Sequence, residues 1–329
     1  MTDTTFDVST TLFDEPGRHG RTGTIHTPHG DIQTPAFIPV ATKATVKMLT
    51  PEQVRSVGAQ AILSNAYHLY LQPGPDIVDE AGGVAAFENW HGPTYTDSGG
   101  FQVMSLGVGF KKVLAMDVAG LTDEDIRAAN KERMARVDDD GVDFKSFIDG
   151  STHRFTPEVS MQIQHQLGAD IMFAFDELTT LVDTRAYQEH SVERTHQWAR
   201  RCLLEHERLT QARPNKPLQS LWGVVQGAQY GICADKQRVA FSPWMRKPAL
   251  RAVVASVVLA SAARLRRRTW APSSAGSPTS CLRISPATCW GSLNPMICSP
   301  PSRPAPTLST ALPPPALAAA VVCTPWTAV

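Results

Sequence analysis

Short strand-like segments that end at a polar side chain recur along the first 230 residues, and this recurrence constrains the fold more than any other feature. Residues 61–65, 92–96, 142–148, 171–175 and 218–225 are predicted strands of this kind. The polar residues that follow them are Asn65, Asp97, Asp149, Asp176 and Gln226. Strands that are apolar along their whole length are typical of parallel sheets covered on both faces.

Helix-start signals separate these strands and complete a β/α pattern. Thr50-Pro51-Glu52 and Thr156-Pro157-Glu158 each combine an N-cap residue with proline at the first helical position. We predict that Gly168 ends the second of these helices, that further helices span 123–136 and 183–209, and that residues 35–40 form another strand.

This pattern predicts an α/β fold, and the polar strand ends favour a (β/α)₈ TIM barrel over an open sheet. The carboxyl ends of barrel strands converge on one face, where the active site lies. Each polar residue taken alone is about as often only a turn former or a helix cap. Five in succession instead suggest recognition of a planar heterocycle, with carboxylates accepting from N–H groups and an aromatic ring stacking.

The segment Thr96-Asp97-Ser98-Gly99-Gly100-Phe101-Gln102 concentrates this chemistry. Its two glycines let the main chain approach a ligand closely, because neither carries a Cβ atom. An ordinary Asp-Ser-Gly-Gly turn is the alternative for the tetrapeptide alone.

The longer segment from Thr96 to Leu106 strongly resembles the signature of tRNA-guanine transglycosylases, which in bacteria exchange the anticodon wobble guanine for a queuosine precursor. Three further segments agree with this family in the same order, namely Ser64–Leu69, Ala174–Glu177 and Gly223–Gly227. The resemblance covers about residues 8–230 and implies a TIM barrel of which this part encodes the first five or six strands.

The resemblance also implies roles for individual residues. Asp97 matches the general acid/base, Phe101 the aromatic that stacks on the base, Asp176 the carboxylate that accepts from its N–H edge, and Gln226 the amide that reads its carbonyl side. The implied substrate-binding set is Asp97, Ser98, Gly99, Gly100, Phe101, Asp176, Gln226 and Gly227. Leu178 stands where many bacterial members have a cysteine, so one edge of the pocket differs.

The partners implied by the family are tRNA with a GUN anticodon, the base guanine or preQ1, and a second copy of the chain. We expect no membrane partner, because no uninterrupted apolar stretch of membrane-spanning length occurs. Cys202 is the single cysteine of residues 1–230, which together with the missing signal peptide indicates a cytoplasmic protein.

Composition changes abruptly after Tyr230. Residues 231–329 hold one acidic and 11 basic residues, so residues 1–230 hold 30 acidic and 20 basic ones. The tail also contains 14 of the 25 prolines. The Arg264–Arg268 cluster could bind nucleic acid, but the stretch lacks the periodicity of helices or strands, and we expect it to be disordered.

The family's mechanism also needs a nucleophilic aspartate in a Phe-Asp-Cys-Val segment and a zinc site of Cys-x-Cys-x-x-Cys plus His. Neither motif occurs after Tyr230. When codons of the tail are read from their third base, residues 306–312 can encode Asp-Thr-Phe-Asp-Cys-Val, and residues 257–264 can encode a glycine-rich segment. We therefore expect a shift of reading frame just after Tyr230, and an inactive chain. The alternative function is a non-catalytic remnant that binds guanine-like bases or RNA.

Other polar residues carry simpler expectations. We expect Asp138-Asp139-Asp140 to be a solvated charge run within an insertion, and Asp149 to be a turn or cap residue. His153 and His165 have no cysteine or third histidine near them in sequence, which favours a packed or solvent-facing role over metal ligation.

Overall fold

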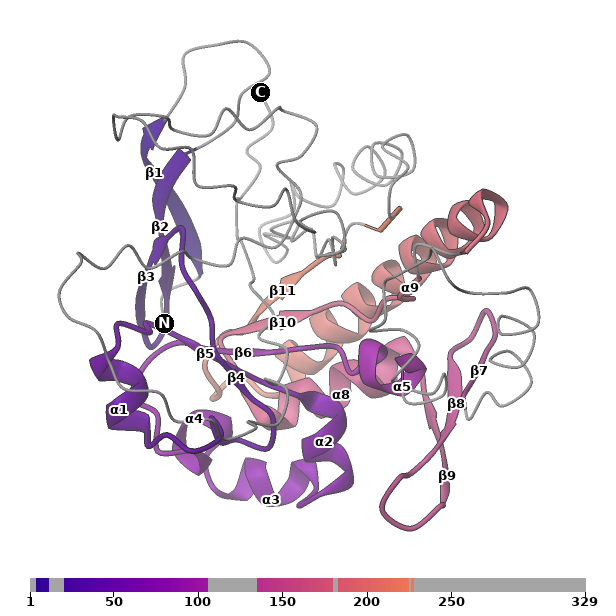
Figure 1. Ribbon diagram of the computed structural model, residues 1–329, viewed down its shortest axis with the longest axis horizontal. Helices are drawn as coiled ribbons and strands as arrows, with labels where there is room; N and C mark the ends of the chain where they lie inside the picture. Colours follow the sequence, from indigo (N-terminus) through magenta and orange to yellow (C-terminus); the bar gives the residue numbers. More distant parts are fainter. Residues whose placement is uncertain (1–3, 12–20, 106–134, 180–182, 225, 228–329) are drawn as a thin grey trace, which may run out of the picture.

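The computed structural model describes residues 4–11, 21–105, 135–179, 183–224 and 226–227 as an α/β structure built on one parallel sheet (Figure 1). Three expectations concern residues beyond 230, which lie outside the described residues: a disordered tail, an arginine cluster that binds nucleic acid, and a shift of reading frame. In the described part of the chain, no helix is long and apolar enough to cross a membrane.

The central sheet has five strands, all parallel, in the spatial order β11-β10-β6-β5-β4. Their bounds are Val40–Ala41 for β4, Ile62–Ser64 for β5, Thr94–Thr96 for β6, Ile171–Phe173 for β10 and Ser220–Trp222 for β11. The spatial order follows the order along the chain without a reversal. In a doubly wound sheet the spatial order of the strands reverses at a switch point. In a barrel each strand lies beside the strand that precedes it in the chain.

Both faces of this sheet are covered, as the uninterrupted apolar strands predicted. On one face Tyr95 and Trp222 pack with Ile25 and Ile32, which come from a separate antiparallel sheet. On the other face the core includes Met161 and the fully buried Trp198. The order of the antiparallel sheet is β1-β2-β3, with bounds Thr5–Thr11, Arg21–Thr27 and Gly30–Thr34.

The helices cover the sheet and begin at the predicted signals. Thr50 and Gln53 form a reciprocal capping box at the start of α1, and the Thr156 side chain caps α8. Gly168 ends α8 with a φ of 70°, in the left-handed region that favours glycine. The bounds are Pro51–Ser56 for α1, Ala66–Leu71 for α2, Pro75–Glu80 for α3, Val84–Phe87 for α4, Gly100–Ser105 for α5, Pro157–Leu167 for α8 and Arg185–Ala212 for α9.

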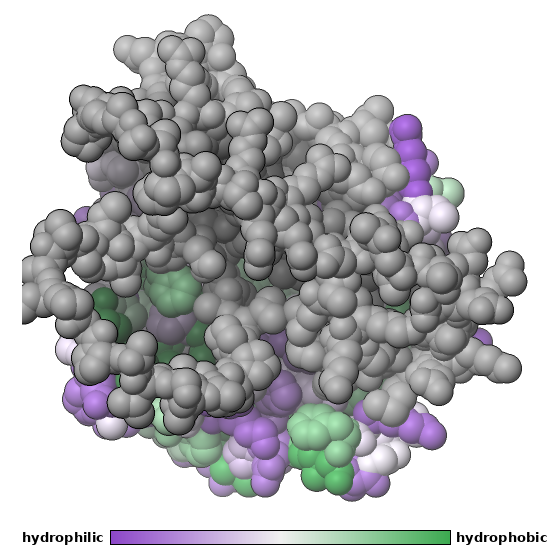
Figure 2. Space-filling view, viewed as in Figure 1, coloured by the Kyte–Doolittle hydropathy of each residue, from purple (hydrophilic) through white to green (hydrophobic). Residues whose placement is uncertain are grey.

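The long helix expected over 183–209 is confirmed by α9, and it packs along α8. Where coloured atoms are visible in Figure 2, hydrophilic and hydrophobic residues lie side by side along the edge that Figure 1 assigns to α1, α2 and α3. A helix that packs against a sheet buries one of its sides and exposes the other, so such a mixed surface is ordinary.

The strand predicted over 142–148 is not part of the parallel sheet, which corrects the sequence analysis. Its first residues form β8, Val142–Lys145, in an antiparallel sheet with β7, Ala135–Val137, and β9, Thr152–Phe155. This sheet projects beside α5 in Figure 1. Asp149 therefore lies in the connection between β8 and β9 and not at the carboxyl end of a parallel strand.

Two further expectations need correction. The helix expected over 123–136 falls mainly on residues outside the described part, and its last two residues begin strand β7. The strand expected over 35–40 is reduced to β4, which begins only at Val40. Pro35 and Pro39 have no backbone N–H to donate to a neighbouring strand, and the Thr34–Pro35 peptide bond is cis.

Candidate active site

Asp97 follows β6 directly, and three donors hold its carboxylate. Asn65 Nδ2 lies 2.5 Å from Oδ2, the Ala66 backbone N–H lies 2.8 Å from Oδ1, and Gln102 Nε2 lies 2.9 Å from Oδ2. Burial raises the pKa of Asp97 above its ordinary value, and these hydrogen bonds oppose the rise. The Asp97 carboxyl group therefore holds a proton more readily than an exposed aspartate does.

Asn65 and Gln102 were not assigned these roles from the sequence. Asn65 precedes α2, but its side chain caps no helix N–H and instead reaches Asp97 at the end of the neighbouring strand. The buried Oε1 atom of Gln102 has no hydrogen-bond partner among the described residues. The amide side chains at a strand end and within the heptapeptide were the only sequence signals for this pair.

The two glycines after Ser98 are required by close packing. Gly99 has a φ of 80°, and a Cβ atom there would lie 2.9 Å from the Phe155 ring. A Cβ atom on Gly100 would lie 2.7 Å from the backbone oxygen of Asp176. An ordinary turn alone does not explain this packing. Gly100 brings the Asp97 loop against the chain just after β10, and Gly99 brings it against Phe155.

Asp176 lies just beyond the end of β10, and protein donors engage both of its carboxylate oxygens. Ser98 Oγ donates to Oδ1 at 3.0 Å, and Gln226 Nε2 donates to Oδ2 at 2.6 Å. Burial raises the pKa of Asp176 to about 6, with the neighbouring charge of Asp97 adding to the rise. Asp176 thus changes charge close to physiological pH.

The remaining predicted residues lie around this pair. Phe101 is partly exposed in the first turn of α5, directly after the close approach at Gly100. Gly227 is buried beside Gln226 and has a φ of 126°. The heptapeptide, the end of β10 and the end of β11 therefore meet at one edge of the sheet, through Ser98, Asp176 and Gln226.

Asp149 does not join this group. Its side chain is exposed and bonds Ser151, and those hydrogen bonds lower the pKa of Asp149 to about 2. This is the turn role expected for Asp149 taken singly, and the strand-end grouping was wrong for this residue.

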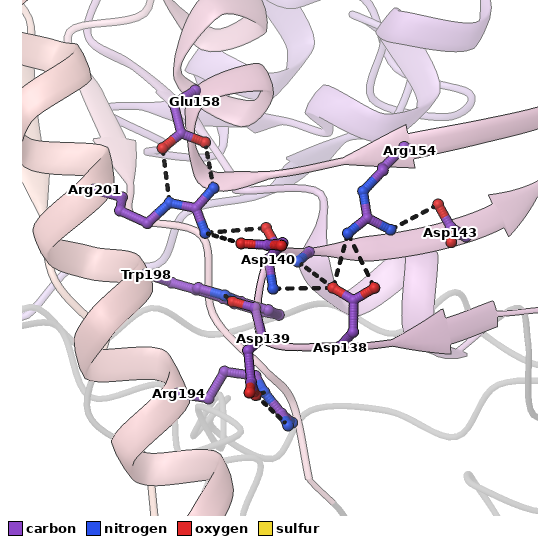
Figure 3. A network of polar contacts seen from close by, with 10 residues as sticks. Asp138, Asp139, Asp140, Asp143, Arg154, Glu158, Arg194, Trp198 and Arg201 are labelled. Atoms are coloured by element: carbon purple, nitrogen blue, oxygen red, sulfur yellow. Dashed lines mark hydrogen bonds and ion pairs between the residues drawn. The ribbon is translucent and has the colours of Figure 1, made fainter.

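The charge run Asp138-Asp139-Asp140 is solvated, as expected, since the Asp139 and Asp140 side chains are 84% and 83% exposed, and it also forms ion pairs. Figure 3 shows three arginines converging on it from β9 and α9. Arg154 pairs with Asp138 at 2.8 Å, Arg194 with Asp139 at 2.9 Å, and Arg201 lies 3.7 Å from Asp140. The network ties the β7–β8 turn to α9, and Arg201 also pairs with Glu158 of α8 at 2.7 Å.

Arg194 extends this network to the residue after Asp176. Its Nη1 atom lies 2.7 Å from Glu177, whose side chain is only 1% exposed. Tyr187 also donates to that carboxylate at 2.6 Å, and Thr195 Oγ1 accepts from the Glu177 backbone N–H. The segment that carries Asp176 is thereby fixed to α9, while Leu178 follows it as a partly buried apolar side chain.

The two histidines considered as metal ligands pack against other groups. His153 hydrogen-bonds Tyr70 and Ser151, and His165 lies 2.9 Å from His206 in a buried pair. Burial lowers the pKa of His165 to about 3. Within the described ranges, no cluster of three or more His, Cys, Asp or Glu side chains could hold a metal ion, and Cys202 is buried in the core. The described residues do not fit a zinc ion.

The parallel sheet thus gathers two carboxyl groups, an amide and an aromatic side chain at its carboxyl edge. The family model described as queuine tRNA-ribosyltransferase matches residues 15–237. The chain belongs to this family.

Curated relatives agree with this membership. The queuine tRNA-ribosyltransferase of Roseiflexus sp. is 46% identical over 234 residues, which cover 68% of this chain and 55% of the relative. Its counterpart in Herpetosiphon aurantiacus is 47% identical over 218 residues, covering 66% and 46% of the two chains, respectively. The counterpart in Staphylococcus epidermidis is 44% identical over 210 residues, covering 64% and 47%. The chain spans about half the length of the curated relatives it matches.

Proposed function

We propose that residues 1–230 form the base-recognition part of a tRNA-guanine transglycosylase, which exchanges the wobble guanine of a GUN anticodon for the precursor preQ1. The observation that carries this proposal is the joining of Asp97 and Asp176 at adjacent strand ends through Ser98, with Gln226 bonded to Asp176. Membership of the family named for tRNA ribosyltransfer supports the same reaction class, a pentosyl transfer to tRNA.

In the proposed site, Asp97 is the general acid/base. It gives a proton to the departing guanine and takes one from the incoming base, while Asn65 and Gln102 hold its carboxylate in place. The raised pKa of Asp97 supports this role, because proton exchange is most efficient when the pKa lies near the working pH.

The other residues bind the base. Asp176 accepts from the N–H edge of guanine, Gln226 reads the carbonyl side, and Phe101 stacks on the ring. In the free protein Gln226 and Ser98 satisfy the Asp176 carboxylate, so the base replaces part of these hydrogen bonds on binding. Gly99 and Gly100 support the pocket because their lack of a Cβ atom lets the Asp97 loop pack against Phe155 and the Asp176 backbone, and Gly227 follows Gln226 directly.

We further propose that the five parallel strands are the first part of an eight-stranded barrel. Their sequential order and uniform direction support this interpretation. Residues 231–329 then form a separate tail, encoded out of frame after Tyr230. It carries neither the nucleophilic aspartate nor the zinc ligands that the family's complete site uses, so no step is assigned to zinc.

It follows that this chain binds the base but does not exchange it. Without the second carboxylate, nothing attacks the ribose to form the covalent intermediate. The alternative, a non-catalytic remnant that binds guanine-like bases or RNA, has the same pocket and differs only in biological use. We place this base binding in the cytoplasm, with tRNA as the macromolecular partner.

Calorimetry with guanine tests the pocket. Asp176→Ala is expected to abolish the heat of binding, whereas Asp149→Ala, which removes an exposed turn aspartate, is the matched control and leaves it unchanged. Equal heats for the wild type and Asp176→Ala would discard the pocket.

An exchange assay with labelled guanine and tRNA tests the missing chemistry, and no incorporation is expected. Sequencing the gene across codons 228–234 tests the frame. An uninterrupted frame that encodes the printed tail would refute the shift.

A further inference from the structure

The two strands that carry Asp97 and Asp176 separate just before the site. Strands β6 and β10 pair only at Tyr95 with Ile171 and at Thr96 with Met172. In a parallel pair the backbone groups of alternate residues point to the same neighbour, so Phe173 N–H and C=O should bond β6 as Ile171 does. The Phe173 carbonyl oxygen bonds a side chain instead, and the same side chain also accepts from the Phe173 N–H, which the Met172–Thr96 pairing directs at β6.

That side chain is Gln164 of helix α8. Its Oε1 atom accepts from the Phe173 N–H at 3.2 Å, and its Nε2 atom donates to the Phe173 carbonyl oxygen at 2.9 Å. The carboxamide therefore takes the place of the β6 backbone donor that would otherwise bond the Phe173 carbonyl oxygen. Gln164 is completely buried, so these hydrogen bonds have no water to replace them.

The same carboxamide holds the other strand. Thr96, the last residue of β6, donates its hydroxyl to Gln164 Oε1 at 2.9 Å. Gln164 Nε2 also donates to Ser160 Oγ at 3.1 Å, and Ser160 in turn donates to the Ser98 carbonyl oxygen at 2.8 Å. Asp97 is thus fixed on both of its chain neighbours by one turn of α8.

We propose that Gln164 is a positioning residue that keeps the carboxyl ends of β6 and β10 apart, and thereby sets the spacing of Asp97 and Asp176 for a heterocyclic base. This inference rests on the proposed function for the identity of the ligand. Without the carboxamide, the Phe173 carbonyl oxygen is left unpaired unless β6 closes onto β10, and that closure brings the two carboxyl groups together.

The decisive variant is Gln164→Leu, which keeps a similar volume and removes every hydrogen bond. Gln219→Leu is the matched control, because Gln219 also bonds backbone oxygens, of Gln164 and Ala169, but precedes β11 at the opposite end of the sheet. Gln164→Glu is the second variant. It keeps the acceptor for Phe173 and Thr96 and loses only the donor.

The first measurement is the titration of the aspartate carboxyl groups by NMR of the full chain, which needs no ligand. In Gln164→Leu the carboxyl of Asp176 is expected to titrate at a higher pH than in the wild type, because a nearer Asp97 disfavours its charge. Gln219→Leu is expected to leave this titration unchanged even if both variants melt at a lower temperature. If Gln164→Leu does not fold, Gln164→Glu is expected to shift in the same direction.

The second measurement is guanine affinity by calorimetry, expected to fall at least tenfold in Gln164→Leu and to stay within twofold in Gln219→Leu. A wild type that binds no guanine would refute the proposed function, and the carboxyl titration would still decide the role of Gln164. If Asp176 titrates at the same pH in the folded Gln164 variant as in the wild type, Gln164 is not a positioning residue.

Discussion

Replacing Arg194 by methionine should destabilise the fold far more than the same replacement of Arg154, although both arginines belong to the network in Figure 3. The Arg194 side chain is 10% exposed and its partner Glu177 is 1% exposed. Arg154 and its partner Asp138 are 38% and 42% exposed. The two ion pairs thus differ mainly in their access to water.

The expected magnitudes follow from this difference. Removing one partner of a buried ion pair costs about 3–5 kcal/mol, because the remaining charge stays buried without compensation. Tyr187 still donates to Glu177 in the variant, so we expect the lower end, about 3 kcal/mol. Breaking an exposed pair costs about 0–1 kcal/mol, so Arg154→Met should cost no more than about 1–2 kcal/mol for its two pairs.

Urea unfolding monitored by tryptophan fluorescence measures both changes, because Trp198 and Trp222 are fully buried in the two core clusters. Methionine keeps most of the apolar stem of arginine, which limits effects of lost packing. If the free energies of unfolding of the two variants fall by the same amount, burial does not govern the strength of this network and the reasoning is wrong.

Three predictions concern the proposed base site. Guanine affinity should rise about tenfold between pH 5 and pH 7, because the pKa of Asp176 is raised to about 6 and only its charged form accepts from the base; calorimetry should show this dependence lost in Asp176→Asn. Gly100→Ala should abolish guanine binding while the protein stays folded by circular dichroism, since the new Cβ atom would lie 2.7 Å from the Asp176 backbone oxygen. Phe101→Ala should weaken guanine binding by about 1–3 kcal/mol, the usual value of base stacking on an aromatic ring, and an unchanged dissociation constant would show that Phe101 does not stack.

Local sequence signals predicted the starts of α1 and α8 and most of α9, because a helix start depends on residues close together in the chain, but α2, α3, α4 and α5 were not predicted. Thr50 and Thr156 are N-caps in the structure, each followed by proline, and Gly168 adopts the left-handed conformation that ends α8. The apolar strands β5, β10 and β11 were predicted for a similar reason, although the predicted ranges were longer than the strands.

The prediction for residues 142–148 failed on a signal that the sequence did contain. Val142 and Phe144 are buried, whereas Asp143 and Lys145 are more exposed, an alternation typical of an antiparallel strand. The segment was instead grouped with the uniformly apolar strands, and Asp149 was consequently placed at the wrong edge. For Pro35–Val40, strand propensity was outweighed by two prolines that cannot donate to a sheet.

The sequence by itself determined that Asp97, Asp176 and Gln226 lie near strand ends, because motif and strand are both local patterns. Only the tertiary structure decided how they meet. Ser98 bonds Asp176 across 78 positions of the chain, Thr96 bonds Gln164 across 68, and Asp139 meets Arg194 across 55. Such contacts depend on strand order, register and helix packing, and no local pattern of residues encodes those distances. The hydrogen bonds of Gln164 to both β6 and β10 come from the packed α8 and not from the motif that contains Asp97.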